Sequence, residues 1–185
     1  MKRWRSSGAW ATGSARRRPL DTSESWPQHG RITRGGPELF EESLGIVREL
    51  DWQWWECYML SNLAAGSRRL NRLDTADRYA REAFPTAGEL GDRMSSVFTA
   101  AEVASVAALR GDVAAAGRIW GAIEAEEELG PVGQWPAQRR EYEAIVLAAA
   151  SSELAESRAQ GRLLSLAEAV GRGGAPPEPV NLDQG

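Results

Sequence analysis

Apolar residues recur along most of this chain at intervals of three and four positions, the spacing of an amphipathic α-helix. Phe40, Leu44 and Val47 share one helical face, and Val113 and Ala116 begin a similar stripe later in the chain. The sequence lacks the long Val, Ile and Thr alternations that predict strands. We therefore expect an all-α fold, with helices over about residues 37–50, 52–70, 75–90, 93–110, 113–129, 136–154 and 165–171.

Helix boundaries are marked by turn and capping residues. Two Gly-Asp pairs, at 91–92 and 111–112, place a glycine where one helix ends and an N-capping aspartate where the next begins. Ser165 and Glu168 form a capping box for the last short helix. Pro85 removes an amide donor inside the third helix, so we expect it to kink or split that helix.

The same helical hairpin is written twice. Residues 63–83 align with residues 103–123 at an offset of 40, which places Leu63 on Val103. The helices over 52–70 and 93–110 are apolar around most of their circumference, which is typical of helices buried on two sides. A fixed period of this size predicts stacked antiparallel helix hairpins, which form a binding surface.

Within each hairpin, the apolar and small positions resemble those of a tetratricopeptide-type repeat. The matching residues are Leu63, Ala64, Leu73, Ala76 and Ala83 in the first hairpin, and Val103, Ala104, Gly111, Asp112, Val113, Ala116 and Trp120 in the second. The period of 40 exceeds the usual repeat of about 34 residues, and Pro85 interrupts a helix that the motif leaves whole.

The order of these segments over residues 38–172 is similar to the helical array that ends bacterial LuxR-type and related ATPase-coupled transcription regulators. That resemblance implies a sensing or docking fragment whose ATPase and DNA-binding domains lie upstream. We do not carry ATP or DNA binding over to this chain, because its sequence contains no GxxxxGK[ST] phosphate loop.

Charge divides the chain into three parts. Residues 1–36 carry eight cations and two acids, whereas residues 37–172 carry 14 cations and 22 acids. The acidic helical part is expected not to bind nucleic acid directly. We interpret residues 1–36 as a disordered basic tail, and we favour an inert extension over an arm that binds nucleic acid or another anionic surface. Residues 173–185 are interpreted as a disordered C-terminal tail.

The cysteine count and the hydropathy indicate a cytoplasmic protein. Cys57, the single cysteine, excludes an internal disulfide and is interpreted as a buried, inert thiol. No stretch approaches the roughly 18 apolar residues of a membrane span, and the basic N-terminus lacks the apolar core of a signal peptide. One lysine against 21 arginines, with many alanines and glycines, indicates GC-rich coding typical of some bacteria.

Residues that would support catalysis or metal binding are scarce. His29 is the single histidine and lies in the predicted tail, which argues against histidine-based triads and metal sites. Glu124 and Glu128 share a helical face and resemble half of a carboxylate metal site, but we favour a solvated helix face. We therefore predict no enzymatic activity, no cofactor and no metal.

The leading functional hypothesis is a noncatalytic module that docks a protein or peptide, including the upstream domains of its own regulator. The concave surface is predicted at Tyr58, Ser61, Asn62, Arg68, Phe98, Ala101 and Ser105. The alternative is a small-molecule sensor, suggested by the apolar cluster of Trp52, Trp54 and Trp55. A helical enzyme is the least favoured. An enclosed pocket lined by Tyr58 and Phe98 would favour the sensor, and an open groove would favour docking.

The predicted helix over 37–50 has one apolar stripe, the pattern of an outer helix in a stack of helix pairs, and residues 1–36 offer no inner helix to pair with it. We expect the apolar stripe of this helix either to pack against the helix over 52–70 or to stay partly exposed. Exposed apolar surface of this kind predicts marginal stability or self-association.

Overall fold

The computed structural model describes residues 36–171, with side chains from residue 42 onward. These residues form eight α-helices and no strand, which confirms the predicted all-α class. The helices are α1 (Gly36–Glu49), α2 (Gln53–Arg69), α3 (Leu73–Glu89), α4 (Arg93–Leu109), α5 (Val113–Glu128), α6 (Trp135–Val146), α7 (Ser152–Gly161) and α8 (Leu166–Gly171). The predicted disordered tails, 1–36 and 173–185, lie almost wholly outside the described residues.

The 40-residue period of the sequence is also the period of the helix boundaries. Helices α2 and α3 begin at residues 53 and 73, and α4 and α5 begin 40 positions later, at 93 and 113. The second residue after each of the first four helix ends takes a left-handed backbone conformation: Asp51, Asn71, Gly91 and Gly111. This conformation closes an α-helix at its C′ position, so one capping geometry recurs every 20 residues.

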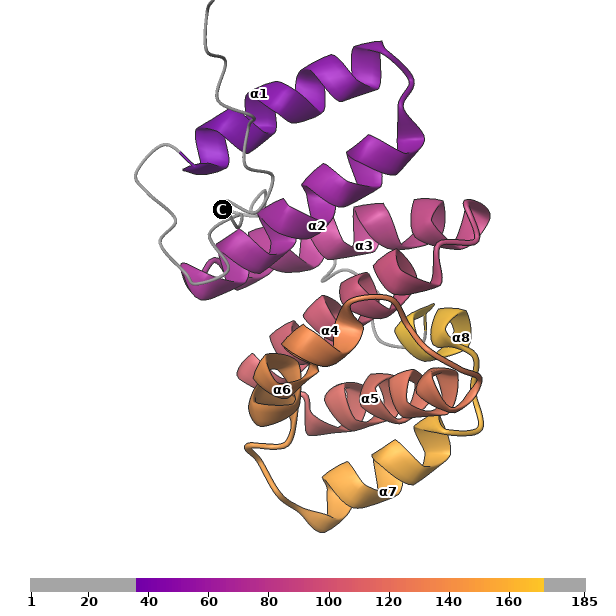
Figure 1. Cartoon of the computed structure of the whole chain (residues 1–185). Helices are drawn as coiled ribbons and strands as arrows, with labels where there is room; N and C mark the ends of the chain where they lie inside the picture. The colour runs from indigo at the N-terminus through magenta and orange to yellow at the C-terminus, as the bar shows by residue number, and fades with distance from the viewer. Residues whose placement is uncertain (1–35, 172–185) are drawn as a thin grey trace, which may run out of the picture. The chain divides into compact units, whose positions relative to one another are not determined.

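Each helix from α1 to α5 packs against the next, and α4 also contacts α2, α6 and α8 (Figure 1). The core lies around α4, whose residues 99–106 are all buried. The side chain of Trp120, one of the residues that match the repeat motif, is fully buried in α5 and lies against Trp135 of α6 with ring centroids 6.3 Å apart.

Helices α5 and α7 cross at glycine residues, and their backbones touch. A Cβ atom on Gly121 would lie 2.0 Å from the carbonyl oxygen of Arg158, and one on Gly161 would lie 1.9 Å from that of Arg118. Gly117 and Gly121 are one turn apart on α5, so they face α7 together. The approach depends on the missing side chains, because any Cβ here would overlap main-chain atoms.

We expect Gly161→Ala to destabilise the protein by about 3 kcal/mol, because α7 has to move away from α5 to admit the methyl group. Gly88→Ala in α3 is the matched control, since a Cβ there meets nothing within 4 Å. That control should gain about 0.5–1 kcal/mol from helix propensity. Urea unfolding of both variants checks the pair, and two changes of the same sign would contradict the crossing geometry.

One local expectation is corrected. The predicted helix over 136–154 is two helices, because α6 ends at Val146 and the Ser151 hydroxyl caps α7 by accepting from the Leu154 amide at 3.1 Å. Of the two outcomes expected at Pro85, the split does not occur, because α3 is continuous from Leu73 to Glu89, and the kink stays a prediction. The Ser165–Glu168 capping box is confirmed in both directions, with Ser165 N donating to Glu168 and Glu168 N donating to Ser165.

Candidate functional site

Three of the residues predicted to line a concave surface are buried. Ala101 and Ser105 of α4 are 0% exposed, and Arg68 near the end of α2 is 6% exposed. The reason is that α4 is enclosed by α2, α3, α5, α6 and α8. These side chains therefore face neighbouring helices and present no surface to a partner.

The other four predicted residues are half-buried: Tyr58, Ser61, Asn62 and Phe98. The Ser61 hydroxyl and the Asn62 amide each donate to a carbonyl one turn earlier in α2, at 2.7 Å. Phe98 packs edge-on against Trp135, with 5.3 Å between ring centroids. Tyr58 stacks on Trp54 at 5.8 Å and so adjoins a group of exposed tryptophans.

Arg68 belongs to a buried polar network that joins α2, α4 and α6. Its Nε donates to Glu102 Oε2 at 2.7 Å, and its Nη2 donates to Glu141 at 3.0 Å. Tyr142 donates its hydroxyl proton to Glu102 at 2.6 Å, and its ring lies 5.2 Å from the Arg68 guanidinium carbon. Glu102 is only 1% exposed, so its charge is balanced within the protein.

The pKa values in this network follow from burial and pairing. Burial by itself lowers the pKa of Arg68, but the charge and hydrogen bond of Glu102 outweigh that effect and raise it. Burial would raise the pKa of Glu141, yet hydrogen bonds from Arg69 and Arg68 bring it below its usual value. Burial and then the Glu102 charge raise the pKa of Tyr142 well above 10.0. Because the folded state favours the neutral phenol, this contribution to stability is present below about pH 10 and is lost as pH rises through the folded pKa of Tyr142.

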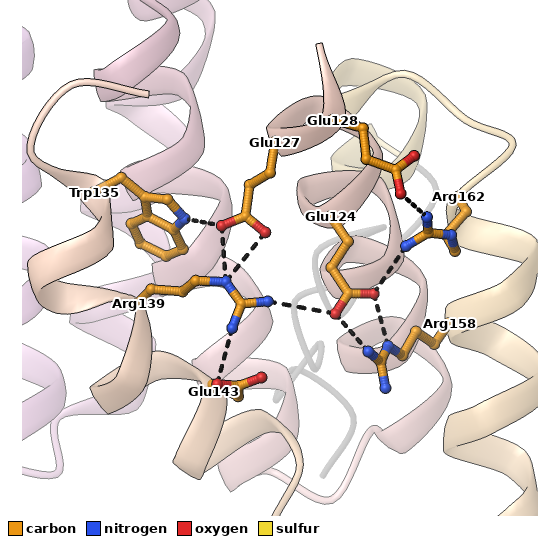
Figure 2. A network of polar contacts seen from close by, with 8 residues as sticks. All are labelled: Glu124, Glu127, Glu128, Trp135, Arg139, Glu143, Arg158 and Arg162. Carbon is orange, nitrogen blue, oxygen red and sulfur yellow. Dashed lines mark hydrogen bonds and ion pairs between the residues drawn. The ribbon is translucent and has the colours of Figure 1, made fainter. Parts of the chain in front are cut away.

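A second network ties α5 to α6 and α7 around Glu124 (Figure 2). Glu124 is 7% exposed and accepts two hydrogen bonds from Arg158, at 2.7 and 2.6 Å, and one from Arg162 at 3.3 Å. A nitrogen of Arg139 lies 3.6 Å from the same carboxylate. The favoured interpretation as a solvated helix face is therefore wrong at Glu124, whose carboxylate is buried and paired with three arginines, whereas the Glu128 side chain is 67% exposed.

Glu127 completes this second network from the α6 side. It accepts from Trp135 Nε1 at 2.6 Å and from Arg139 Nε at 2.8 Å, while Arg162 also binds Glu128 (Figure 2). Charges of both signs are paired throughout this network, so it fixes helix positions and leaves no concentrated field for an anionic ligand.

A group of exposed apolar side chains lies over the end of α1 and the start of α2. Of the ten large apolar side chains that are well exposed between residues 42 and 171, five fall in this short segment. We call this group the tryptophan surface; it consists of Ile46, Leu50, Trp52, Trp54 and Trp55, which are 54%, 50%, 54%, 45% and 41% exposed. Leu44 and Val47 of α1 are buried, so the stripe of α1 is packed on one side and exposed on the other.

The tryptophan surface is partly ordered by its own contacts. Trp54 and Trp55 meet edge-to-face at 5.0 Å, and Trp54 Nε1 donates to Asp92 at 3.1 Å. The three tryptophans line an open depression of about 490 Å³ together with Asp51, Gln53 and Leu90. Concentrated, exposed apolar area of this kind marks an interaction site more often than isolated leucines do.

Trp52 occupies a position at which α4 and α5 place a capping aspartate, whereas α3 places Arg72, which also makes no capping hydrogen bond. Asp92 and Asp112 cap α4 and α5 by accepting from the amides of Ser95 and Ala115, at 3.0 and 2.9 Å. The backbone of Trp52 (φ −92, ψ 74) is close to that of Asp112 (φ −80, ψ 75), yet its indole makes no capping hydrogen bond. A large exposed indole at a capping position departs from local stability rules, and such departures are expected at functional sites.

Trp52→Asn should be more stable than Trp52→Ala by about 1 kcal/mol, because asparagine in this backbone conformation can accept from the helix amides. Both variants lose the indole, so the difference between their free energies of unfolding reports the capping hydrogen bond alone. Denaturant unfolding of the two variants gives the difference. Equal stabilities would show that α2 does not share the capping geometry of α4 and α5.

Within the described helices, no group of three or more His, Cys, Asp or Glu residues is arranged to hold a metal ion. The same part of the chain contains no helix long and apolar enough to cross a membrane. The predicted burial of Cys57 is confirmed at 1% exposure, and burial raises the pKa of its thiol.

Comparison with known proteins identifies no relative: no family model, curated protein or solved structure matches this chain. The geometry of the described helices is therefore the basis for a functional proposal.

The sequence contained signals for the residues that its interpretation missed. Glu102 is the one charged residue between 94 and 109, and a lone carboxylate in an apolar helix needs a buried partner. Gly117 and Gly121, four residues apart in α5, indicate a close helix approach. The partners, Arg68 and α7, could not be assigned by spacing because they come from other helices.

Proposed function

We propose that this protein is a noncatalytic docking module that binds a polypeptide partner through the tryptophan surface. The observation that carries the proposal is the exposure of Trp52, Trp54 and Trp55 in one place, each at 41% or more. Tryptophan is enriched among the residues that dominate binding energy at protein interfaces. The buried network around Glu102 includes Arg68 of α2 and so ties the helix that carries the three tryptophans to α4 and α6.

The shape of the surface favours docking over the alternative of small-molecule sensing. The depression beside the tryptophans is open, and neither Tyr58 nor Phe98 lines it. Phe98, which an enclosed sensor pocket would use, is instead packed against Trp135 and Tyr142. Small-molecule pockets bury most of their ligand, whereas an open apolar depression suits the side chains of a peptide.

The resemblance to tetratricopeptide-type repeats and to the helical arrays of LuxR-type regulators supports the same proposal. In that proposal the helix pairs stack as a short solenoid, and the chain acts as the docking part of a bacterial cytoplasmic regulator. The recurrence of helix starts at an offset of 40 residues is the feature that supports a repeat.

A displayed library of random peptides tests the docking function directly. We expect enrichment of peptides that bind the native protein and bind Trp55→Ser at least tenfold more weakly, since loss of an aromatic anchor costs about 2 kcal/mol. Leu163→Ser is the matched control, because Leu163 is 86% exposed but lies outside the tryptophan surface. Enriched peptides that bind both variants equally would contradict the proposal.

A further inference from the structure

The 40-residue equivalence of α2 and α4 shows what kind of element fits beside Trp55. Trp55 of α2 corresponds to Ser95 of α4. The Ser95 hydroxyl donates to Asp92 Oδ2 at 2.8 Å, and the same oxygen accepts the indole proton of Trp54 from α2 at 3.1 Å. The side of α4 that carries Ser95 therefore lies next to α2, and Ser95 is half-buried there. The equivalent side of α2 carries Trp55, which is 41% exposed.

Trp52 leads to the same conclusion. It corresponds to Asp92, whose carboxylate accepts the indole proton of Trp54 from α2 at 3.1 Å. Thus Asp92 of α4 is in direct contact with α2, and Ser95 is linked to α2 through the Asp92 carboxylate. A helix laid on α2 in the same relation would meet Trp52 and Trp55 and cover the apolar area that is now exposed.

The charges around the tryptophan surface select the partner. Glu42, Glu49 and Asp51 are exposed beside it. Arg48 is the one cation between residues 42 and 56, and its guanidinium binds Glu56 at 2.6 Å and also binds Glu82. The rim is therefore acidic, and complementary charge on a partner means lysine or arginine.

The same acidic rim disfavours a second copy of this chain as the occupant. In a two-fold dimer built on this surface, each partner presents the same patch to the other. The acidic residues Glu42, Glu49 and Asp51 of one copy would then be brought near the acidic rim of the other, and like charges brought together oppose association.

We propose that the tryptophan surface binds an amphipathic, basic α-helix of a partner polypeptide, placed against α2 as α2 is placed against α4. This inference rests on the proposed docking function and adds the conformation and charge of the partner. The apolar stripe of the bound helix covers Trp52 and Trp55, and its flanking lysines or arginines lie beside Glu49 and Asp51.

Three synthetic peptides of about the length of α2 test the inference with the full chain. The first carries a leucine stripe at helical spacing flanked by lysines, the second replaces the lysines with glutamates, and the third keeps the first composition with the stripe scrambled. Calorimetry should show binding of the first peptide, with at least tenfold weaker binding of the other two.

Matched protein variants assign that binding to the proposed surface. Trp52→Asn and Trp52→Ala should each weaken binding of the lysine-flanked peptide at least tenfold and to the same extent, although the two variants differ in stability. The double variant Glu49→Gln with Asp51→Asn should weaken binding of this peptide about threefold and make the binding less dependent on salt, since it removes two negative charges beside the tryptophan surface. Leu163→Ser should bind as the native protein does.

Several outcomes would overturn the inference. If the glutamate peptide binds as tightly as the lysine peptide, the partner does not need to be basic; if the scrambled peptide does, the partner does not need to be an amphipathic helix. Unchanged peptide binding by the Trp52 variants would show that the peptide binds elsewhere on the protein. Self-association of the native chain in sedimentation, abolished by Trp55→Ser, would identify a second copy as the occupant. If the displayed library yields tryptophan-dependent peptides that are not basic helices, the docking function stands and this inference fails. If it yields no such peptide, the docking function itself fails.

Discussion

Replacing Glu102 with alanine is expected to destabilise the protein by about 3–5 kcal/mol, because it leaves a buried charge without its main partner. Arg68 is 6% exposed and would keep only the Glu141 carboxylate, which lies near the surface. Tyr142 would lose the acceptor that its hydroxyl reaches at 2.6 Å. Equilibrium unfolding in urea measures the loss.

Two further variants separate charge from hydrogen bonding at this site. Glu102→Gln keeps acceptor oxygen for Tyr142 but removes the charge, so it should cost less than the alanine variant. The double variant Arg68→Met with Glu102→Met should recover much of the lost stability, since no unpaired charge remains. A double variant as unstable as Glu102→Ala would show that the network contributes through packing instead of charge.

Trp120→Ala is the second large effect, with an expected loss of about 3–5 kcal/mol. The indole is fully buried in α5, packs against Trp135, and has the Arg139 guanidinium carbon 5.3 Å from its ring centroid. Its removal leaves a cavity between α5 and α6 that neighbouring side chains fill only partly. Thermal unfolding monitored by far-ultraviolet circular dichroism checks the prediction.

Trp120→Phe is the matched control for this cavity. The indole nitrogen of Trp120 makes no hydrogen bond within residues 36–171, so phenylalanine removes volume without removing a polar contact. Its cost should be less than about half that of Trp120→Ala. An unchanged melting temperature for Trp120→Ala would mean that this residue does not anchor the core.

The helices and their period were predictable because they depend on local signals. The stripes of α1 and α5, the Gly-Asp pairs and the Ser165 capping box each lie within a few residues of one another in sequence. The break after Val146 was missed because an alanine-rich run has high helix propensity, which outweighed the weaker capping signal of Ser151.

The candidate site was only partly predictable, because burial depends on which helices meet. Arg68 was expected on a concave surface, but Glu102 and Tyr142, on two other helices, draw it into the interior. Trp52, Trp54 and Trp55 were recognised as a cluster, and their aromatic composition alone suggested a ligand between helices. Their exposure and the missing cap at Trp52, which change that interpretation, follow from the fold.

The central claim, that the tryptophan surface is the docking site, is tested most directly by nuclear magnetic resonance of ¹⁵N-labelled tryptophan indoles. The lysine-flanked amphipathic peptide is titrated into the full chain, and signals are assigned by single substitutions. We predict that the indole signals of Trp52, Trp54 and Trp55 shift and saturate together, while those of the buried Trp120 and Trp135 stay in place. Saturable binding that leaves the three exposed indoles unchanged would contradict the account.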